Sequence, residues 1–374
     1  MIIITPVISK NELKQFIDFP HDLYADDANY VPELYITQRD MLTTGKHPSL
    51  KHLQLQLFLA KKGDEVVGRV AAIINRNYTE QVKKNEAFFG FFDTVKDYEV
   101  AEKLLEAVVN WHAEKGINKI IGPVNYTTND PCGVLIDGFQ HPPQVMTTYN
   151  KPYYKDYLEK YGFIKQMDLL SYWFGEYTIP ERIMYLAKNI EKRLQRNGIT
   201  IRTANLKNFA QEASSIKKIY NKAWDKNWGF VPFTDEEFDY VAKSMKLILD
   251  TDFTLVAEKN GEVIGFALAL PNINQIQKNV RKGRLLPTGV FKLLFNKSKI
   301  NSVRVITLGI LEPYRTLGIE ACFYTKITEA ARRKKYTGAE ASWILENNEM
   351  MNRELKNIGS AVYKTHRLYS MNIE

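Results

Sequence analysis

The chain contains the stretch TLGILEPYRTLGIEACFYTKITEAARRKK at residues 307–335. Its first part is apolar and predicts a strand that ends at Glu312-Pro313. From about Gly318 to Lys334, apolar residues recur every three or four positions, which predicts an amphipathic helix. Because a short turn joins the two elements, backbone N–H groups at the helix start are available to a ligand. Such turns bind phosphate or pyrophosphate, and the alternative is a plain structural turn.

Two residues of this turn favour a ligand. Gly318 has no Cβ, so a ligand can approach the backbone closely, and Arg315 adds a positive charge. The segment resembles the acyl-CoA-binding loop of the GNAT superfamily of N-acyltransferases, which reads Arg/Gln-x-x-Gly-x-Gly/Ala after a strand. Further along, Asn348, Leu355 and Gly359 resemble the Asn…Leu-Tyr…Gly-Phe element of that family. The resemblance implies that acyl-CoA is held by Leu308, Gly309, Ile310, Tyr314, Arg315, Thr316, Leu317, Gly318, Ile319 and Asn348.

The sequence departs from the family pattern in two places. Glu320 stands where most members have Gly or Ala, and a carboxylate there would repel a pyrophosphate unless it points away. Leu355 and its counterpart Leu158 stand where many members have a tyrosine that acts as general acid. The resemblance therefore does not identify the residue that acts as general acid.

Two segments of the chain occur twice, at the same spacing. Phe58–Ile73 and Leu255–Leu270 both predict a strand, a tight turn and a second strand. Leu158–Tyr172 and Leu355–Tyr369 both predict a helix that is closed by glycine and followed by a strand. The first half has no acyl-CoA loop, because Asp93–Glu99 lacks the arginine and the glycines.

We therefore expect an α/β (α+β) protein with two tandem GNAT-like domains. Each domain would have a mixed, mostly antiparallel sheet flanked by helices. The sequence places a degenerate domain at residues 1–176, a helical linker at 177–198 and an acyl-CoA-binding domain at 199–374. The second domain carries an insertion at residues 274–300, and a chain of 374 residues is long enough for two domains.

The composition is that of an ordinary soluble protein, with 45% hydrophobic and 25% charged residues. The cysteines Cys132 and Cys322 cannot form a disulfide framework, and no His, Cys or Asp cluster has the spacing of metal ligands, so we expect no metal. No apolar run approaches the roughly 20 residues that span a bilayer, and the N-terminus does not resemble a signal peptide. We expect a cytoplasmic protein.

The positive charge is concentrated in one segment. The chain has 51 basic and 43 acidic residues, a net charge of +8. Between Val263 and Leu311 there is no acidic residue, and the basic ones are Lys278, Arg281, Lys282, Arg284, Lys292, Lys297, Lys299 and Arg304. The same segment contains the apolar run LLPTGVFKLLF, so peripheral contact with an anionic inner-membrane face is expected. Docking on CoA phosphates or on the first half are the alternatives, and the absence of a recognised motif argues against nucleic acid.

The reaction implied by the resemblance requires a proton acceptor for the amine and stabilisation of the thioester oxygen. Glu346, at the end of a predicted strand, is the candidate base, and Tyr363 is the candidate acid. Solvated or structural roles are the alternatives for both. Loops that mix aromatic and amide side chains often bind ligands, so the candidate acceptor-binding residues are Trp224, Asn227, Trp228, Asn129 and Asp130. Packing between the halves is the alternative for these loops.

These patterns predict a transferase that moves an acyl group from acyl-CoA to an amine. The co-substrate would be acetyl-CoA or a longer acyl-CoA, with no tightly bound cofactor. The basic, apolar insertion favours an amino-lipid or sphingoid base over a small amine. Two other functions stay open: a tRNA-dependent aminoacyl transferase of the cell-wall bridge type, and an inactive CoA-binding sensor.

Overall fold

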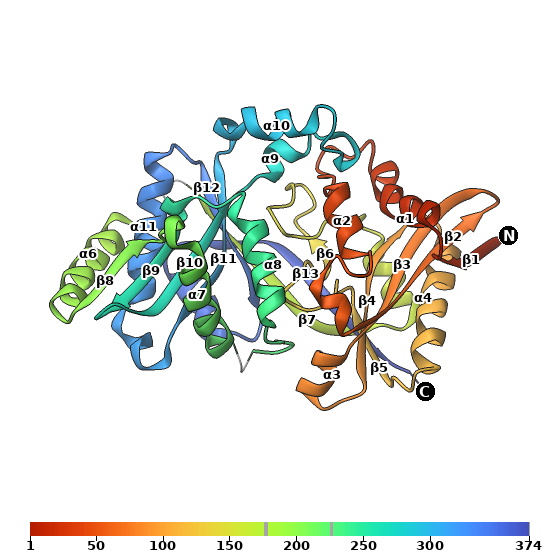
Figure 1. Ribbon diagram of the computed structural model, residues 1–374, viewed down its shortest axis with the longest axis horizontal. Helices are drawn as coiled ribbons and strands as arrows, with labels where there is room; N and C mark the ends of the chain where they lie inside the picture. The colour runs from red at the N-terminus through yellow and green to blue at the C-terminus, as the bar shows by residue number, and fades with distance from the viewer. Residues whose placement is uncertain (176–178, 225–226, 374) are drawn as a thin grey trace.

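Figure 1 shows a computed structural model of the chain, which describes all residues except 176–178, 225–226 and 374. The predicted domain boundary at residue 176 therefore lies outside the described residues. In the first half the strands are β1 (Ile2–Pro6), β2 (Leu53–Lys62), β3 (Glu65–Asn75), β4 (Glu86–Thr94), β5 (Lys119–Gly122), β6 (Val134–Asp137) and β7 (Ile164–Gly175). The helices of this half are α1 (Lys10–Leu23), α2 (Tyr35–Met41), α3 (Arg76–Val82), α4 (Tyr98–Ala113) and α5 (Tyr154–Tyr161).

A connecting helix, α6 (Glu181–Arg196), leads into the second half. Its strands are β8 (Ile199–Thr203), β9 (Thr254–Lys259), β10 (Glu262–Pro271), β11 (Ser302–Ile310), β12 (Gly338–Leu345) and β13 (Ala361–Asn372). Its helices are α7 (Phe209–Ala223), α8 (Asp235–Lys246), α9 (Asn274–Gln277), α10 (Gly289–Phe295), α11 (Ile319–Arg333) and α12 (Glu349–Asn357).

The repeated segments fold alike, as the sequence predicts. The first repeat forms the β2–β3 hairpin in one half and the β9–β10 hairpin in the other. In the second hairpin both turn residues have positive φ, 53° at Asn260 and 82° at Gly261, which suits the Asn-Gly pair. The other repeat forms α5–β7 and α12–β13, and Gly162 ends α5 with a φ of 115°.

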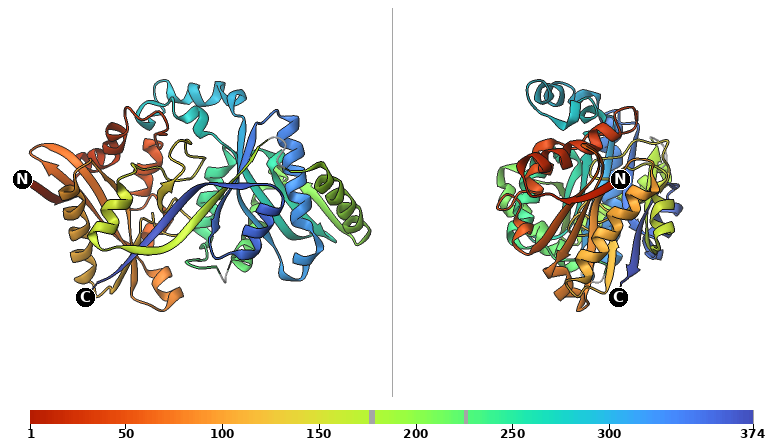
Figure 2. Two further views of the ribbon diagram at one scale, coloured as in Figure 1. Left: turned by 180° about the vertical axis from the view of Figure 1, so that it is seen from behind. Right: turned by 90° about the vertical axis from the view of Figure 1, so that its right-hand side faces the viewer.

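The two halves share one sheet because they exchange their last strands. The strand order is β1-β2-β3-β4-β5-β13-β7-β12-β11-β10-β9-β8, with β6 beside β13. Strand β13, at the end of the chain, pairs with β5 of the first half, and β7 pairs with β12 of the second half. Figure 2 shows these two long strands crossing between the halves. Only β4–β5 and β11–β12 are parallel among the described pairs, so the mixed, mostly antiparallel α/β fold is confirmed.

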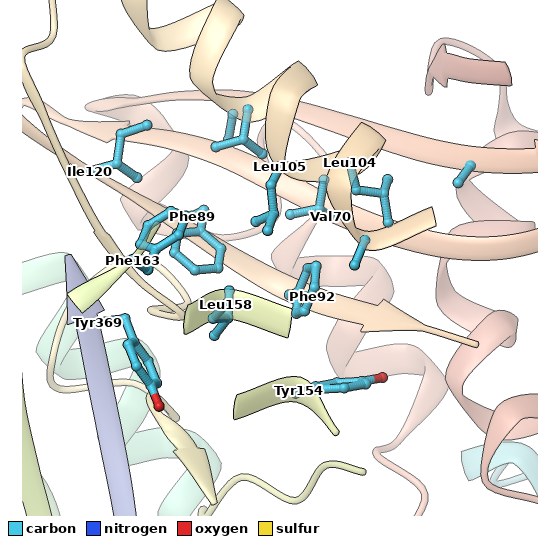
Figure 3. Close-up of a cluster of buried hydrophobic side chains, with 14 of the residues drawn as sticks. Val70, Phe89, Phe92, Leu104, Leu105, Ile120, Tyr154, Leu158, Phe163 and Tyr369 are labelled. Atoms are coloured by element: carbon cyan, nitrogen blue, oxygen red, sulfur yellow. The ribbon is translucent and has the colours of Figure 1, made fainter. Parts of the chain in front are cut away.

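The exchange also completes the first-half core. Tyr369 of β13 is fully buried in a cluster with Phe89, Leu104 and Phe163. Figure 3 shows this tyrosine on its strand beside the side chains of the first half. If the chain is divided at one point between β7 and β8, the first half loses β13 and the second half loses β7, although each strand belongs to that half's part of the sheet. The proposed domain limits stay a prediction.

Helix α6 lies antiparallel along α11 in the second half. Lys188 on α6 pairs with Glu329 on α11 at 2.9 Å, and Glu191 pairs with Lys326 at 2.8 Å. The C-terminal end of α6 is thereby placed beside the N-terminus of α11, where the predicted acyl-CoA loop ends.

The parallel strands β11 and β12 separate part-way along their length. They pair from Ser302 opposite Gly338 to Val305 opposite Ala341, and not beyond. At the same point β11 has a bulge opposite Leu268 and Ala269 of β10. The later residues of β11 therefore present backbone groups that β12 does not use, which is where a ligand chain can hydrogen-bond.

The basic insertion folds over the first half. Arg284 pairs with Asp18 of α1 at 2.7 Å, and Lys282 pairs with Asp22 at 2.6 Å. The Gln277 side chain donates to the backbone carbonyl of Pro32 at 3.0 Å. Figures 1 and 2 show α9 and α10 as an arm that bridges the two halves along one edge of the molecule. Docking on the first half, one of the alternatives from the sequence, is thus observed for part of the insertion.

Candidate active site

The predicted acyl-CoA loop has the strand–turn–helix geometry that its sequence indicates. A 3-10 turn over Glu312–Leu317 leads to Gly318, which has a φ of 81° and precedes α11. The N-cap residue Gly318 has no side chain to cap the helix, so the first N–H groups of α11 have no carbonyl partner within the helix. The Arg315 side chain is exposed and anchored by its Nε, which donates to the Ile310 carbonyl at 3.1 Å. These groups fit a pyrophosphate.

Helix α6 closes one side of this loop, which the sequence did not indicate. A Cβ added at Gly318 would lie 3.2 Å from the Cδ1 of Ile190, so α6 limits the space beside the glycine. The Arg193 guanidinium donates to the Leu317 carbonyl at 3.4 Å. Arg193 therefore adds a second positive charge near the start of α11. The local sequence of α6 does not indicate that Arg193 lies beside the start of α11.

Glu320, the departure from the family pattern, lies at the start of α11. Its Oε2 is buried and, among the described residues, has no hydrogen-bond partner. Burial raises the pKa of the Glu320 carboxyl, and the nearby Glu354 raises it further. The raised pKa, against the opposing hydrogen bond from the Glu320 backbone, shifts the carboxyl toward its neutral form, which repels a pyrophosphate less than a carboxylate does.

Strand β11 connects the loop to the predicted acceptor residues. A Cβ added at Gly309 would lie 2.9 Å from the Cζ3 of Trp224, so the glycine allows the indole to pack on the strand. Leu308 and Ile310, the neighbours of Gly309 in β11, pack in the hydrophobic core of the second half. Asn348 caps α12, and its Oδ1 accepts from the Met351 N–H at 3.2 Å.

A cavity of ≈ 280 Å³ lies between β10–β12 and the helices α7 and α8. We call it the aromatic cavity, because Tyr220, Phe230, Phe233, Phe238 and Trp343 line it. The five predicted acceptor-binding residues all line this one cavity: Trp224, Asn227, Trp228, Asn129 and Asp130. Three come from the second half and two from the first, so the structure brings together residues that are distant in the sequence.

The first-half loop reaches this cavity by binding the second half. The Thr128 hydroxyl donates to the Gly229 carbonyl at 2.8 Å. The Asn129 amide donates to the Val231 carbonyl at 3.0 Å and accepts from the Tyr220 hydroxyl at 2.7 Å. This loop therefore packs between the halves, which was the alternative from the sequence, and it also lines the aromatic cavity.

A second cavity of ≈ 550 Å³ lies between α1–α2, β4, α8 and α9. We call it the interface cavity. Its wall contains a buried ion pair, in which the Arg69 Nε lies 2.8 Å from an oxygen of Asp93. The hydroxyls of Tyr24 and Tyr154 lie 3.1 Å and 3.3 Å from the other oxygen. The two cavities adjoin, because both are lined by Asp130, Cys132, Met146, Val241 and Met245.

The two residues predicted to be catalytic lie outside the linings of both cavities. Glu346 pairs with Lys165 at 2.6 Å, and its other oxygen accepts from the Asp168 N–H at 3.0 Å. The Tyr363 hydroxyl donates to Glu340, whose side chain is fully buried. Both contacts are structural in kind, and the catalytic roles of Glu346 and Tyr363 stay predictions.

Arg304, one of the basic residues of the acid-free segment Val263–Leu311, is a residue of the cavity wall. Only 3% of it is exposed, and its Nε donates to the Ser342 hydroxyl at 2.8 Å. Its Nη1 donates to the carbonyls of Val145 at 2.7 Å and Met146 at 2.9 Å. Arg304 thus fixes Met146 where the two cavities meet. Because Arg304 stands among other basic residues in the sequence, its buried position in the cavity wall could not be predicted from the local pattern.

Comparisons with known proteins agree with the fold. No protein-family profile matches the sequence. The chain is 35% identical to Protein YghO of Escherichia coli, over 98% of this chain and 94% of that protein. It is 33% identical to a bacterial ceramide synthase of Caulobacter vibrioides, over 98% of this chain and 96% of that protein. A tandem GNAT protein from the clavulanic acid biosynthesis pathway has the same fold over 100% of this chain and 98% of its own, with a TM-score of 0.57 and 9% identity.

The chain has the tandem GNAT fold, and it belongs to the same family as Protein YghO of Escherichia coli and the bacterial ceramide synthase of Caulobacter vibrioides. The turn that resembles the acyl-CoA motif, Arg315 to Gly318, has a counterpart with neither the arginine nor the glycines in the first half. Among the described residues, no group of three or more His, Cys, Asp or Glu side chains could hold a metal ion.

The loop makes a testable prediction about Gly318→Ala. The left-handed backbone costs an L-residue about 1–2 kcal/mol, and the added Cβ crowds Ile190. We expect the dissociation constant for CoA to rise by roughly tenfold, since the N–H groups of the loop must move. Isothermal titration calorimetry with CoA measures this change.

Gly116→Ala is the matched control, because Gly116 has a φ of 70° with nothing within 4 Å of an added Cβ. It carries the backbone penalty without touching the loop, so its CoA affinity should equal that of the wild type. Equal affinities for all three proteins would contradict the assignment of Gly318 to the CoA site.

Proposed function

We propose that the chain is an N-acyltransferase that moves a long acyl chain from acyl-CoA to the amino group of a sphingoid base or similar amino-lipid. The observation that carries the proposal is the pair of adjoining cavities. The aromatic cavity is lined by Trp224, which packs on Gly309 of β11, and it extends along α7 and α8 to Met245 and Leu249. Its lining is mostly apolar, which suits a hydrocarbon chain.

The acyl-CoA would bind along the second half. Its pyrophosphate would lie at Tyr314–Ile319, and its pantetheine arm would run beside Leu308–Ile310 where β11 leaves β12. The thioester would then reach the bulge of β11, where Ile306 and Thr307 line the aromatic cavity. Among the described residues, the Thr307 hydroxyl is buried without a hydrogen-bond partner, so a carbonyl or amide of the substrate could satisfy it.

The amino-lipid would occupy the interface cavity. This cavity is the larger of the two and carries more polar groups, including Arg69 and Asp93. A sphingoid base has hydroxyls beside its amine, and buried polar groups select such a headgroup. The relative from Caulobacter vibrioides is named a bacterial ceramide synthase, and a ceramide is the product of this reaction class.

The purified protein is expected to convert palmitoyl-CoA and sphinganine into an N-acylated product and free CoA. Mass spectrometry detects the lipid product, and a thiol reagent measures the CoA. Palmitoyl-CoA should support turnover well above that with acetyl-CoA, because the aromatic cavity binds the chain. Turnover of small amines with acetyl-CoA alone would contradict the proposal.

The exposed face of the insertion would hold the protein at an anionic membrane surface, on the cytoplasmic side. Leu286, Phe291, Leu294 and Phe295 are 79%, 57%, 57% and 77% exposed. Lys278, Arg281, Lys292, Lys297 and Lys299 are exposed on the same segment. Adjacent apolar and basic side chains suit the boundary between lipid tails and headgroups. Helix α9 of the arm lines the interface cavity, so docking would bring this cavity close to the lipid. Within the described residues, no helix is long and apolar enough to cross a membrane.

Membrane contact predicts a loss of vesicle binding in the double variant Phe291→Ser/Phe295→Ser. Co-sedimentation with vesicles of phosphatidylglycerol and phosphatidylcholine measures it. Wild-type binding should weaken as salt rises, because the basic residues act electrostatically.

The matched control is Ile8→Ser/Leu247→Ser, which removes two exposed apolar side chains elsewhere. This control should bind vesicles like the wild type. A parallel loss in both double variants, or no binding by the wild type, would argue against the membrane surface.

A further inference from the structure

Asp130 occupies the point where the two cavities meet. It is one of the five residues that line both. The other four are Cys132, Met146, Val241 and Met245, which carry no charge at neutral pH. Asp130 is therefore the acidic residue that the two linings share.

The surrounding loop holds Asp130 in a fixed orientation. Its Oδ2 accepts from the Thr127 N–H at 3.1 Å and from the Thr127 hydroxyl at 3.0 Å. No hydrogen bond within the described residues reaches its Oδ1. The neighbours Thr128 and Asn129 bind main-chain carbonyls of the second half, so the loop keeps its place against α7. One oxygen is therefore fixed, and the other is available to a ligand.

The surroundings of Asp130 raise the affinity of its carboxylate for a proton. Burial raises the pKa of Asp130 to about 7, and the carboxylate of Glu237 adds to the increase, against the opposing hydrogen bonds from Thr127. The other titratable groups that interact with it are Tyr126 and Cys132 on its own loop and Tyr220 on α7. Arg304 and Glu212 line the aromatic cavity, and His47 lines the interface cavity.

We propose that Asp130 is the catalytic base, which takes a proton from the ammonium group of the acceptor at the junction of the two cavities. The inference rests on the proposed function and deepens it. The neutral amine then forms a bond from nitrogen to the thioester carbonyl carbon. The C–S bond breaks with its electron pair on sulfur, and CoA leaves as a thiol with the second amine proton. Asp130 returns its proton to solvent.

Three other carboxylates are less suited to this step. Asp93 also lines the interface cavity, but the Arg69 guanidinium and two tyrosine hydroxyls engage it. Glu237 is held by Ser49 at 2.6 Å and His52 at 3.2 Å, and its pKa is lowered to about 2. Glu346 lies in its ion pair outside both cavities. Asp130 alone among these four lies at the junction.

The test is Asp130→Asn, assayed with palmitoyl-CoA and sphinganine. An asparagine oxygen can still accept both bonds from Thr127, so the loop should keep its shape. We expect kcat to fall by roughly 100-fold or more, with little change in the KM for palmitoyl-CoA. The base works in its ionised form, so the wild-type rate should rise with pH up to about 7 and then level off. The variant should lack this rise.

Two further measurements separate a chemical role from a structural one. A long-chain alkoxyamine is neutral at pH 7 and does not need the base, so the variant should use it at a rate close to that of the wild type. Asp239→Asn is the matched control, because Asp239 is exposed on α8, a helix that lines both cavities. It should behave as the wild type with both acceptors.

An Asp130→Asn protein with full activity on sphinganine would overturn the inference, and so would an equal loss with sphinganine and the alkoxyamine. A wild-type protein that acylates neither acceptor would instead overturn the proposed function. Glu346→Gln and Tyr363→Phe in the same assay test the two catalytic residues predicted from the sequence.

Discussion

The exchange of β7 and β13 between the halves is the constraint on which the rest of the structure depends. Each half lacks the strand that completes its part of the sheet, and the other half supplies it. Backbone hydrogen bonds along both strands therefore fix the relative position of the halves, which a flexible linker could not do. That fixed position brings the loop Thr127–Asp130 against α7 and the segment after it, and it lets two cavities meet between the halves.

The two halves repeat one pattern but differ at the turn that follows the parallel strand pair. In the second half the separation of β11 from β12 leads to an uncapped helix and a left-handed glycine, which suit an anionic co-substrate. In the first half the corresponding strands β4 and β5 also pair over only a few residues. There the buried pair of Arg69 and Asp93 lines a second cavity, and the loop has neither the arginine nor the glycines. A buried ion pair is stable only when it is well hydrogen-bonded, and Tyr24, Tyr154 and Gln38 provide those bonds.

Features that depend on neighbouring residues could be predicted from the sequence. The Asn260-Gly261 hairpin, the turn at Gly318 and the helix after it follow from local backbone preferences, and the repeat predicted two similar halves. Trp224 and Asp130 are candidate acceptor-binding residues because their loops mix aromatic and amide side chains, and the structure gathers them on one cavity. The strand exchange was not predicted, because a strand carries no signal for its partner. Arg304 and Arg193 were missed for a related reason: a basic residue in a basic run or a linker helix looks solvated until its neighbours in space are known.

The proposed function depends on whether the acyl chain of acyl-CoA lies in the aromatic cavity. The most direct measurement is photo-crosslinking with a palmitoyl-CoA that carries a diazirine at the end of its chain, followed by peptide mass spectrometry. The account predicts that the label falls on α7 and α8, in peptides that contain residues such as Phe238, Met245 and Leu249, and that unlabelled palmitoyl-CoA prevents it. Labelling confined to the exposed surface of α10, or labelling that palmitoyl-CoA does not reduce, would contradict it.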